Sequence, residues 1–200
     1  MHEDPTHAKT SPGVQVRSRG RRARICGAVG ALATVGVVVS PALARAADVA
    51  SKALPTRTVA FTGHYKGNVA LLIDNSKVTI SSVAGKGTGT LVGASTVSGT
   101  GSASASAQCD PFSGTGAIAG PGTRIDFLVT SSSSQGCSSG ESGPITVTFK
   151  GVAKATSGTG KAKGVSGDLT FKGSLHLGNT TGSQKGAFTV TVTGRLALKG

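Results

Sequence analysis

The chain has 200 residues, which suggests a single domain, and it contains 31 glycines, six phenylalanines, one tyrosine and no tryptophan. With so few aromatic side chains, the chain has little of the material that supplies the largest buried areas of a core. The formal net charge is +13, but only +8 of it belongs to residues 47–200, where the lysines are scattered. Acids are too few and too far apart to supply the paired carboxylates of a glycosidase.

Residues 1–46 have the pattern of a secretory signal peptide. A polar stretch that ends in arginines precedes an apolar run over residues 25–39. Small residues then occupy the −3 and −1 positions of a cut, either after Ala46, which leaves Ala47 as the first residue, or after Ala44. A membrane anchor is the alternative, but the apolar run is shorter than the ~20 residues that span a bilayer. We therefore expect cleavage and a secreted, extracellular protein with no membrane span afterwards.

The export route is open between two alternatives. Arg21-Arg22 is typical of twin-arginine signals. Gly20 and Arg24 do not match the usual neighbours of that motif, which favours ordinary secretion with a basic leading segment. Residues 47–57 are then expected to form a flexible lead-in, and residues 58–200 a single domain.

The domain is predicted to consist of short strands. Thr58–Tyr65 alternates apolar and polar residues, and the continuous apolar run Val69–Ile73 is predicted to be a strand buried on both sides. Lys77–Ala84 resumes the alternation after a turn. Gly85–Ala107 is low in complexity, so it is either a disordered linker or a pair of weakly patterned strands, and its β-branched residues favour strands. Further strands are predicted at Phe112–Ile118, Arg124–Ser131, Ile145–Ala155, Leu169–Leu177 and Ala187–Lys199.

Many short strands separated by glycine-rich turns indicate a barrel or a sandwich. We predict an all-β fold, a closed antiparallel barrel of about eight strands, with a β-sandwich as the alternative. Closure removes the exposed strand edges that a Val- and Thr-rich sheet would otherwise present.

Cys109 and Cys137 are the only cysteines that follow the signal segment. Export to an oxidising compartment predicts that they form a disulfide. The strands between them read as a hairpin that turns at Pro121-Gly122, which would bring its outer ends within bonding distance. Cys137 itself is expected in a loop over Ser131–Gly143. The chain has no Cys-x-x-Cys motif and no histidine near either thiol, so we predict no metal site and no cofactor.

His64 and Tyr65 lie where a strand is predicted to end, a position that suits the rim of a barrel. One hypothesis places them at the mouth of a ligand site, and the other makes them ordinary surface or turn residues, which is commoner for a histidine without a partner. No serine lies in a nucleophile motif, so no catalytic residue is predicted.

Several lysines are close together in sequence, but the phenylalanines near them are in phase with the core. Nucleic-acid binding would need a focused basic patch with stacking aromatic rings. We therefore predict a solvated face, no specific nucleic-acid binding, and a weak attraction to anionic cell-wall polymers. These lysines are Lys150, Lys154, Lys161, Lys163 and Lys172.

The segment Thr156–Phe171 reads Thr-Ser-Gly-Thr-Gly-Lys-Ala-Lys-Gly-Val-Ser-Gly-Asp-Leu-Thr-Phe. It resembles the Thr-Gly-Gly-Thr-Gly-x-Phe-x-Gly-Ala-x-Gly turn of the allene oxide cyclase and dirigent barrel proteins, and similar turns of secreted actinobacterial proteins. The segment departs from that pattern at Ser157, Ala162 and Val165. The resemblance covers one turn and one strand and implies an eight-stranded barrel of calycin type. None of the polar pocket residues of those enzymes aligns with this chain, so no catalytic role is carried over.

Two functions fit these observations. The first is a secreted, non-enzymatic barrel with a binding or structural role in the cell envelope or medium, whose partner would be a small hydrophobic ligand or an anionic cell-wall polymer. The second, implied by the resemblance, is an enzyme of allene oxide cyclase or dirigent type that shapes a hydrophobic intermediate in its lumen. The lumen separates the alternatives, because ligand binding or catalysis needs a roomy pocket with a few converging polar groups, whereas a lumen filled by Leu, Val and Phe favours a structural role.

Overall fold

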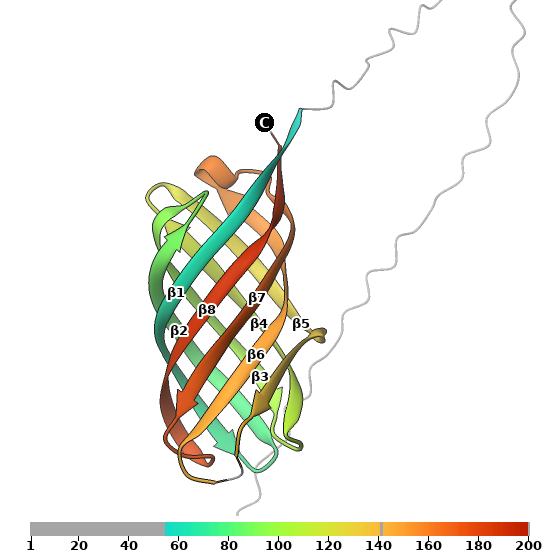
Figure 1. Cartoon of the computed structure of the whole chain (residues 1–200). Coiled ribbons are helices and arrows are strands. Elements are labelled where there is room, and N and C mark those ends of the chain that lie inside the picture. The colour runs from blue at the N-terminus through green and yellow to red at the C-terminus, as the bar shows by residue number, and fades with distance from the viewer. Residues whose placement is uncertain (1–54, 141, 200) are drawn as a thin grey trace, which may run out of the picture. The chain divides into compact units, whose positions relative to one another are not determined.

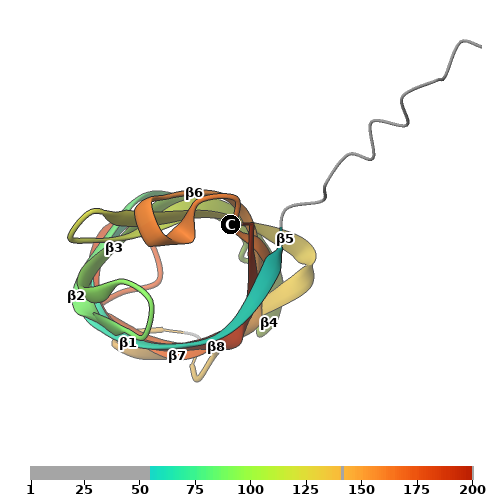
Figure 2. The same ribbon diagram turned by 90° about the horizontal axis from the view of Figure 1, so that it is seen from above.

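The structure is a computed structural model that describes residues 55–140 and 142–199. The predicted signal peptide and its cleavage site at Ala46 and Ala47 lie outside these described residues. Eight strands follow one another along the chain: β1 (Thr56–Asp74), β2 (Lys77–Gly89), β3 (Gly93–Ser104), β4 (Cys109–Gly120), β5 (Thr123–Ser138), β6 (Ile145–Thr159), β7 (Ser166–Leu177) and β8 (Gly182–Lys199). Each strand pairs antiparallel with the next, and β8 pairs with β1 to close a barrel (Figure 1 and Figure 2). The predicted all-β closed barrel is confirmed, and a β-sandwich is excluded.

Side chains along the strands alternate between the lumen and the outer surface, as the two-residue period of a strand requires. In β8, Phe188, Val192 and Leu196 are buried, whereas Thr193 and Arg195 are exposed. The inner surface is therefore apolar, and the outer surface of this strand is polar. Because the sheet is closed, no strand is left as an edge that could pair with another chain.

Aromatic side chains in the lumen lie over glycines of the neighbouring strand. Phe149 of β6 is opposite Gly173 of β7, and a Cβ atom at Gly173 would lie only 2.6 Å from the Phe149 ring. Phe127 of β5 and Gly116 of β4 form the same kind of pair, with the same 2.6 Å separation. The missing side chain on one strand leaves room for the ring of the next, and the ring covers the bare backbone. This pairing explains how a glycine-rich chain forms long, well-covered strands.

The two ends of the barrel differ. At one end, Val92 and Val165 are buried together with Ala162 of the short 3-10 turn η1 (Gly160–Ala162), which lies at the rim in Figure 2. These residues pack with Leu196 and other buried side chains into a core that fills this end. The other end carries the β1–β2, β3–β4, β5–β6 and β7–β8 connections, and the lumen opens there.

The structure changes several local predictions. The run Val69–Ile73 is not a separate strand buried on both sides; it is the last part of β1, and Leu72 is 46% exposed. A barrel wall is one layer thick, so only its inner face can be buried. β1 begins at Thr56, so the last two residues of the expected lead-in 47–57 are strand residues paired with β8. The low-complexity region Gly85–Ala107 forms the end of β2 and all of β3, which confirms strands rather than a linker.

Candidate functional site

The open half of the barrel encloses a cavity of about 960 Å³. Its wall is built from inward-facing apolar side chains of all eight strands, among them Val69, Val83, Val97, Phe112, Val129, Phe149, Leu175 and Val190. This volume is near the upper end of the ~300–1,000 Å³ that is usual for small-molecule sites. The cavity is therefore the candidate binding site.

Three phenylalanine rings of the cavity wall lie close to one another. The ring centroid of Phe171 lies 5.9 Å from that of Phe112 and 6.3 Å from that of Phe149, with interplanar angles of 54° and 49°. Tilted rings at these separations are a favourable aromatic arrangement. A molecule that entered from the mouth would meet these rings before the core that fills the closed end.

The mouth of the cavity is polar. Loop residues that line it are Asn75, Ser106, Gln108, Ser139 and Thr180. Among the described lining residues, Asp110 is the only one with an ionisable side chain. Its carboxylate accepts hydrogen bonds from the backbone N–H groups of Ser106 and Ala107, each at 3.0 Å, and from the Ser106 hydroxyl, also at 3.0 Å. The carboxylate thus organises the β3–β4 loop.

The described lining residues supply an apolar enclosure with one carboxylate at its mouth. General acid–base catalysis needs a proton donor or acceptor positioned against the reacting atoms. The single carboxylate among the described lining residues is engaged by its own loop, and the rest of the described wall offers no second titratable side chain. The lumen can therefore surround and orient an apolar molecule by shape and contact.

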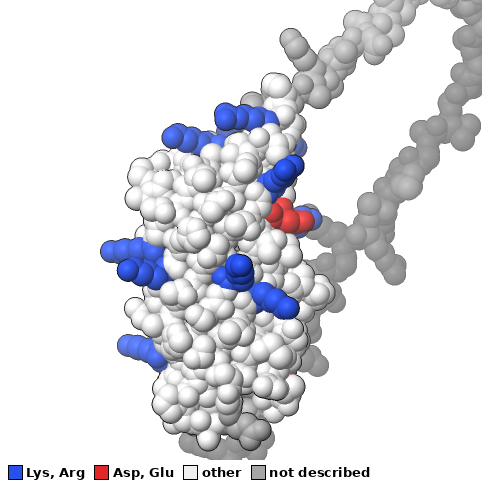
Figure 3. All heavy atoms as spheres, viewed as in Figure 1, with Lys and Arg blue, Asp and Glu red and all other residues white. Residues whose placement is uncertain are grey.

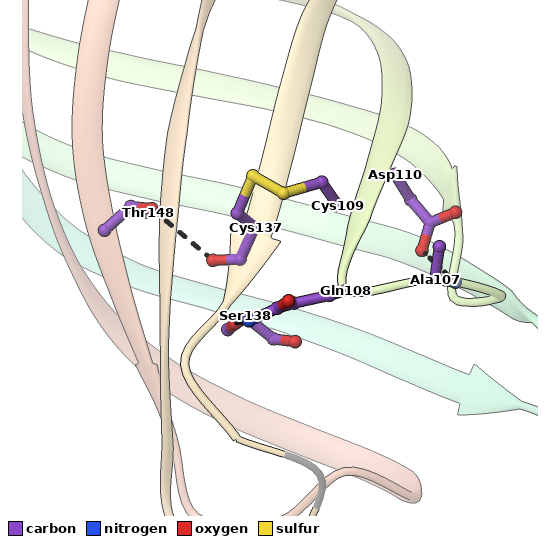
Figure 4. Close-up of a disulfide and its surroundings, with 7 residues drawn as sticks. All are labelled: Ala107, Gln108, Cys109, Asp110, Cys137, Ser138 and Thr148. Carbon is purple, nitrogen blue, oxygen red and sulfur yellow. Dashed lines mark hydrogen bonds between the residues drawn. A yellow bond between two sulfur atoms is a disulfide. The ribbon is translucent and has the colours of Figure 1, made fainter.

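A disulfide joins β4 to β5 beside the mouth. Cys109 and Cys137 are directly opposite each other, with their Cα atoms 4.0 Å apart (Figure 4). The predicted disulfide is confirmed, and the chain between the cysteines is a hairpin that turns at Pro121-Gly122, where the glycine has a φ of 65°. Cys137 is in a strand and not in the expected loop Ser131–Gly143, because β5 continues to Ser138.

The disulfide lies beyond an interruption in the β4–β5 ladder. Between the paired positions β5 has the five residues 130–134 where β4 has only two, which shifts the register, and only Cys109–Pro111 and Gln135–Cys137 are paired on the mouth side of that shift. Pro111 has no N–H group to donate to this short ladder. The covalent bond therefore holds β4 against β5 where backbone hydrogen bonding is sparse.

His64 and Tyr65, considered as mouth residues from the sequence, lie within β1 and point to opposite sides of the wall. His64 is on the outer surface, and its Nδ1 atom is 3.2 Å from the Thr191 hydroxyl. Tyr65 is 4% exposed in the core, with its hydroxyl 3.1 Å from that of Ser95. Burial raises the pKa of Tyr65, and the hydrogen bond with Ser95 opposes this rise. Neither residue is among those that line the lumen cavity.

The lysines that are close in sequence are divided by the fold. Lys150 of β6 is directly opposite Lys172 of β7, whereas Lys161 belongs to η1 at the closed end. Lys66 of β1 and Lys86 of β2 form a second directly opposite pair. All four paired lysines line a shallow depression on the outer surface of the barrel. Sequence reasoning missed Lys66 and Lys86, because only the strand register brings them near the other pair.

The fold and the cavity together define a class, an up-and-down barrel with an apolar lumen that is open at one end. No family model, no curated protein and no solved structure matches the chain. The resemblance of Thr156–Phe171 to the allene oxide cyclase and dirigent proteins therefore stays a prediction from those residues. In the described part of the chain, no helix is long and apolar enough to cross a membrane, and no group of three His, Cys, Asp or Glu residues is arranged to hold a metal ion.

Proposed function

We propose that the protein is a secreted, non-enzymatic barrel that binds a small apolar molecule in its lumen. The observation that carries this proposal is the apolar cavity of about 960 Å³, which is open to solvent at one end and filled by the core at the other. A disulfide is compatible with the oxidising compartment to which a signal peptide would deliver the chain.

The wall favours apolar ligands over polar ones. Transfer of apolar surface from water into such a cavity is favourable by roughly 25 cal/mol per Å². Polar groups of a ligand that entered deeply would lose their hydrogen bonds with water and find few partners, which costs free energy. We therefore expect an elongated or compact apolar body inside the lumen, with any polar end of the ligand held near the serine, asparagine and glutamine side chains of the mouth.

Nile red, an uncharged fluorophore that brightens in apolar surroundings, is a direct probe of this site. If each non-hydrogen atom contributes roughly 0.3 kcal/mol of binding free energy, a ligand of about twenty such atoms binds with about 6 kcal/mol, which corresponds to a Kd of tens of micromolar. We expect saturable binding of one molecule per chain in that range. Mass spectrometry of the native protein should in addition detect a co-purified apolar compound if the ligand is retained.

A matched pair of variants locates the binding. Ala103 faces the lumen near the mouth, and Ser102 beside it in β3 is exposed on the outer surface. Ala103→Phe should weaken Nile red binding at least tenfold by occupying the cavity, and Ser102→Phe should leave it unchanged. Absence of saturable binding, or equal effects of the two substitutions, would overturn the proposal.

A further inference from the structure

The outer surface of the barrel carries a shallow depression of about 830 Å³, which shares only Phe149 and Val190 with the lining of the lumen cavity. It extends from β2 over β1, β8, β7 and β6 to Gln135 and Cys137 of β5, and the strands β1, β8, β7 and β6 form the face that is turned to the viewer in Figure 1 and Figure 3. Basic side chains are spread over this face in Figure 3, and the acidic groups visible in this view lie away from the middle of the face. The cationic residues that line the depression are Lys66, Lys86, Lys150 and Lys172.

The four lysines form two like-charge pairs. Lys66 is directly opposite Lys86, and Lys150 is directly opposite Lys172. Like charges placed directly opposite on neighbouring strands destabilise a sheet. Lys66 is opposite Thr189 of β8, and Lys172 is opposite Thr191 of the same strand. With a strand spacing of ~4.8 Å and a rise of ~3.3 Å per residue, the Cα atoms of Lys66 and Lys172 are therefore about 12 Å apart.

In the part of the chain that the structure describes, no carboxylate in the depression neutralises the four lysine ammonium groups. The aspartates of the described residues lie outside the depression, and the ion pair found among them joins Arg124 to Asp126 elsewhere on the barrel. Four cations on one concave surface therefore create a positive potential that an anionic partner would neutralise. The repulsion within each lysine pair would fall when negative charge lies between the two ammonium groups.

The remaining side chains of the depression indicate the chemistry of the anion. All four strong cations are lysines, which act as point charges toward phosphate, whereas arginine is favoured for two-pronged recognition of carboxylates. Hydroxyl donors for phosphate oxygens lie among them, on Thr88, Ser174, Thr189 and Thr191, whereas the Thr148 hydroxyl donates to the Cys137 carbonyl oxygen. The tyrosine and all six phenylalanines lie on the inner side of the wall, so this face offers no aromatic ring for stacking against nucleic-acid bases.

We propose that this face binds a linear phosphodiester polymer without bases, of the polyol phosphate class. Successive phosphates lie along the depression, and the two lysine pairs supply the main attraction. The site is independent of the lumen, because the wall of the barrel separates them. Loss of apolar ligand binding and loss of polymer binding are therefore separate outcomes.

Binding of poly(glycerol phosphate) to the full chain, measured by calorimetry over a salt series, tests the proposal. Neutralising about four phosphates predicts a slope of log K against log salt concentration of about −3, from ~0.7 per phosphate on a single strand. This slope corresponds to about a 50-fold loss of affinity between roughly 50 and 200 mM salt. A double variant, Lys66→Gln/Lys172→Gln, removes one cation from each pair and should halve the slope.

The control variant Lys161→Gln/Lys163→Gln lowers the net charge by the same amount at the closed end of the barrel. It should keep the slope and affinity of the native chain. The melting temperature of Lys66→Gln/Lys172→Gln should be unchanged or higher, because the substitutions relieve like-charge contacts. Equal losses of affinity in the two double variants would mean that net charge alone determines binding, and this result would overturn the proposal. Tighter binding of single-stranded DNA or of polygalacturonate at matched charge, or no binding of poly(glycerol phosphate), would also overturn it.

Discussion

Replacing both disulfide cysteines by serine, in the variant Cys109→Ser/Cys137→Ser, should lower the free energy of unfolding by about 3.5 kcal/mol. The two residues are 28 positions apart, and the chain-entropy relation for a loop of that length gives about 12 cal/mol/K of entropy restored to the unfolded chain. For a domain of roughly 150 residues the entropy of unfolding is about 0.3 kcal/mol/K, so the melting temperature should fall by about 10 °C.

The structure also predicts which end of the barrel loses protection from hydrogen exchange in this variant. The cysteines close a short ladder segment on the mouth side of the bulge at residues 130–134, and Pro111 leaves that segment short of donors. Hydrogen exchange of the Ser138 amide, which donates to the Gln108 carbonyl at 2.8 Å, should accelerate more than that of the Val165 amide at the closed end.

Urea unfolding followed by circular dichroism measures the loss of stability, and hydrogen exchange read out by mass spectrometry measures its location. A loss below about 1 kcal/mol would refute the loop-entropy argument. Equal acceleration of exchange at the two ends of the barrel would refute the view that the bond acts at the mouth.

Two further changes test the packing of the wall. Because burial raises the pKa of Tyr65 above its ordinary value of 10.0, the stability that its protonated hydroxyl contributes is complete below pH 10 and is lost as the pH rises through the folded-state pKa. Phenolate absorbance of this one tyrosine should therefore rise together with unfolding, and a phenolate that forms at the ordinary pKa in an intact barrel would contradict its burial. Gly87→Ala should cost about 1–3 kcal/mol in urea unfolding, since its methyl group would overlap the His64 carbonyl oxygen. The control Gly136→Ala should cost less, because its methyl group would meet only Val147 Cγ1 at 3.5 Å, and equal costs would argue against close strand contact as the cause.

The barrel was predictable because alternation is a property of each strand alone. Ile125 and Phe127 face inward and Asp126 faces outward, as their spacing indicates. The expectation that a strand ends at His64 and Tyr65 was wrong for a related reason. β1 does not end at Tyr65 but continues to Asp74, and neighbours in a strand must point to opposite sides of the wall.

Neither the cavity nor the basic face could be predicted, because both depend on which residues are opposite each other. Phe149 covers Gly173 only in the observed register, and the free volume of the lumen is what remains after such pairs are formed. Lys66 and Lys172 are more than a hundred residues apart in the chain, and β8 brings them together by pairing with both of their strands. Lengths and registers of hairpins set these contacts, and glycine-rich sequences specify register weakly.

Seven of the eight strand pairings join neighbours along the chain, and the eighth joins the first strand to the last, with Thr56 opposite Lys199. The barrel is thus circular in space although the polypeptide is linear. Its last closure must bring together segments separated by nearly the whole domain, and this is the step with the largest loop entropy. A short linker from Lys199 to Thr56 would remove that cost and make every hairpin turn, including Pro121-Gly122, a place where new termini could be opened.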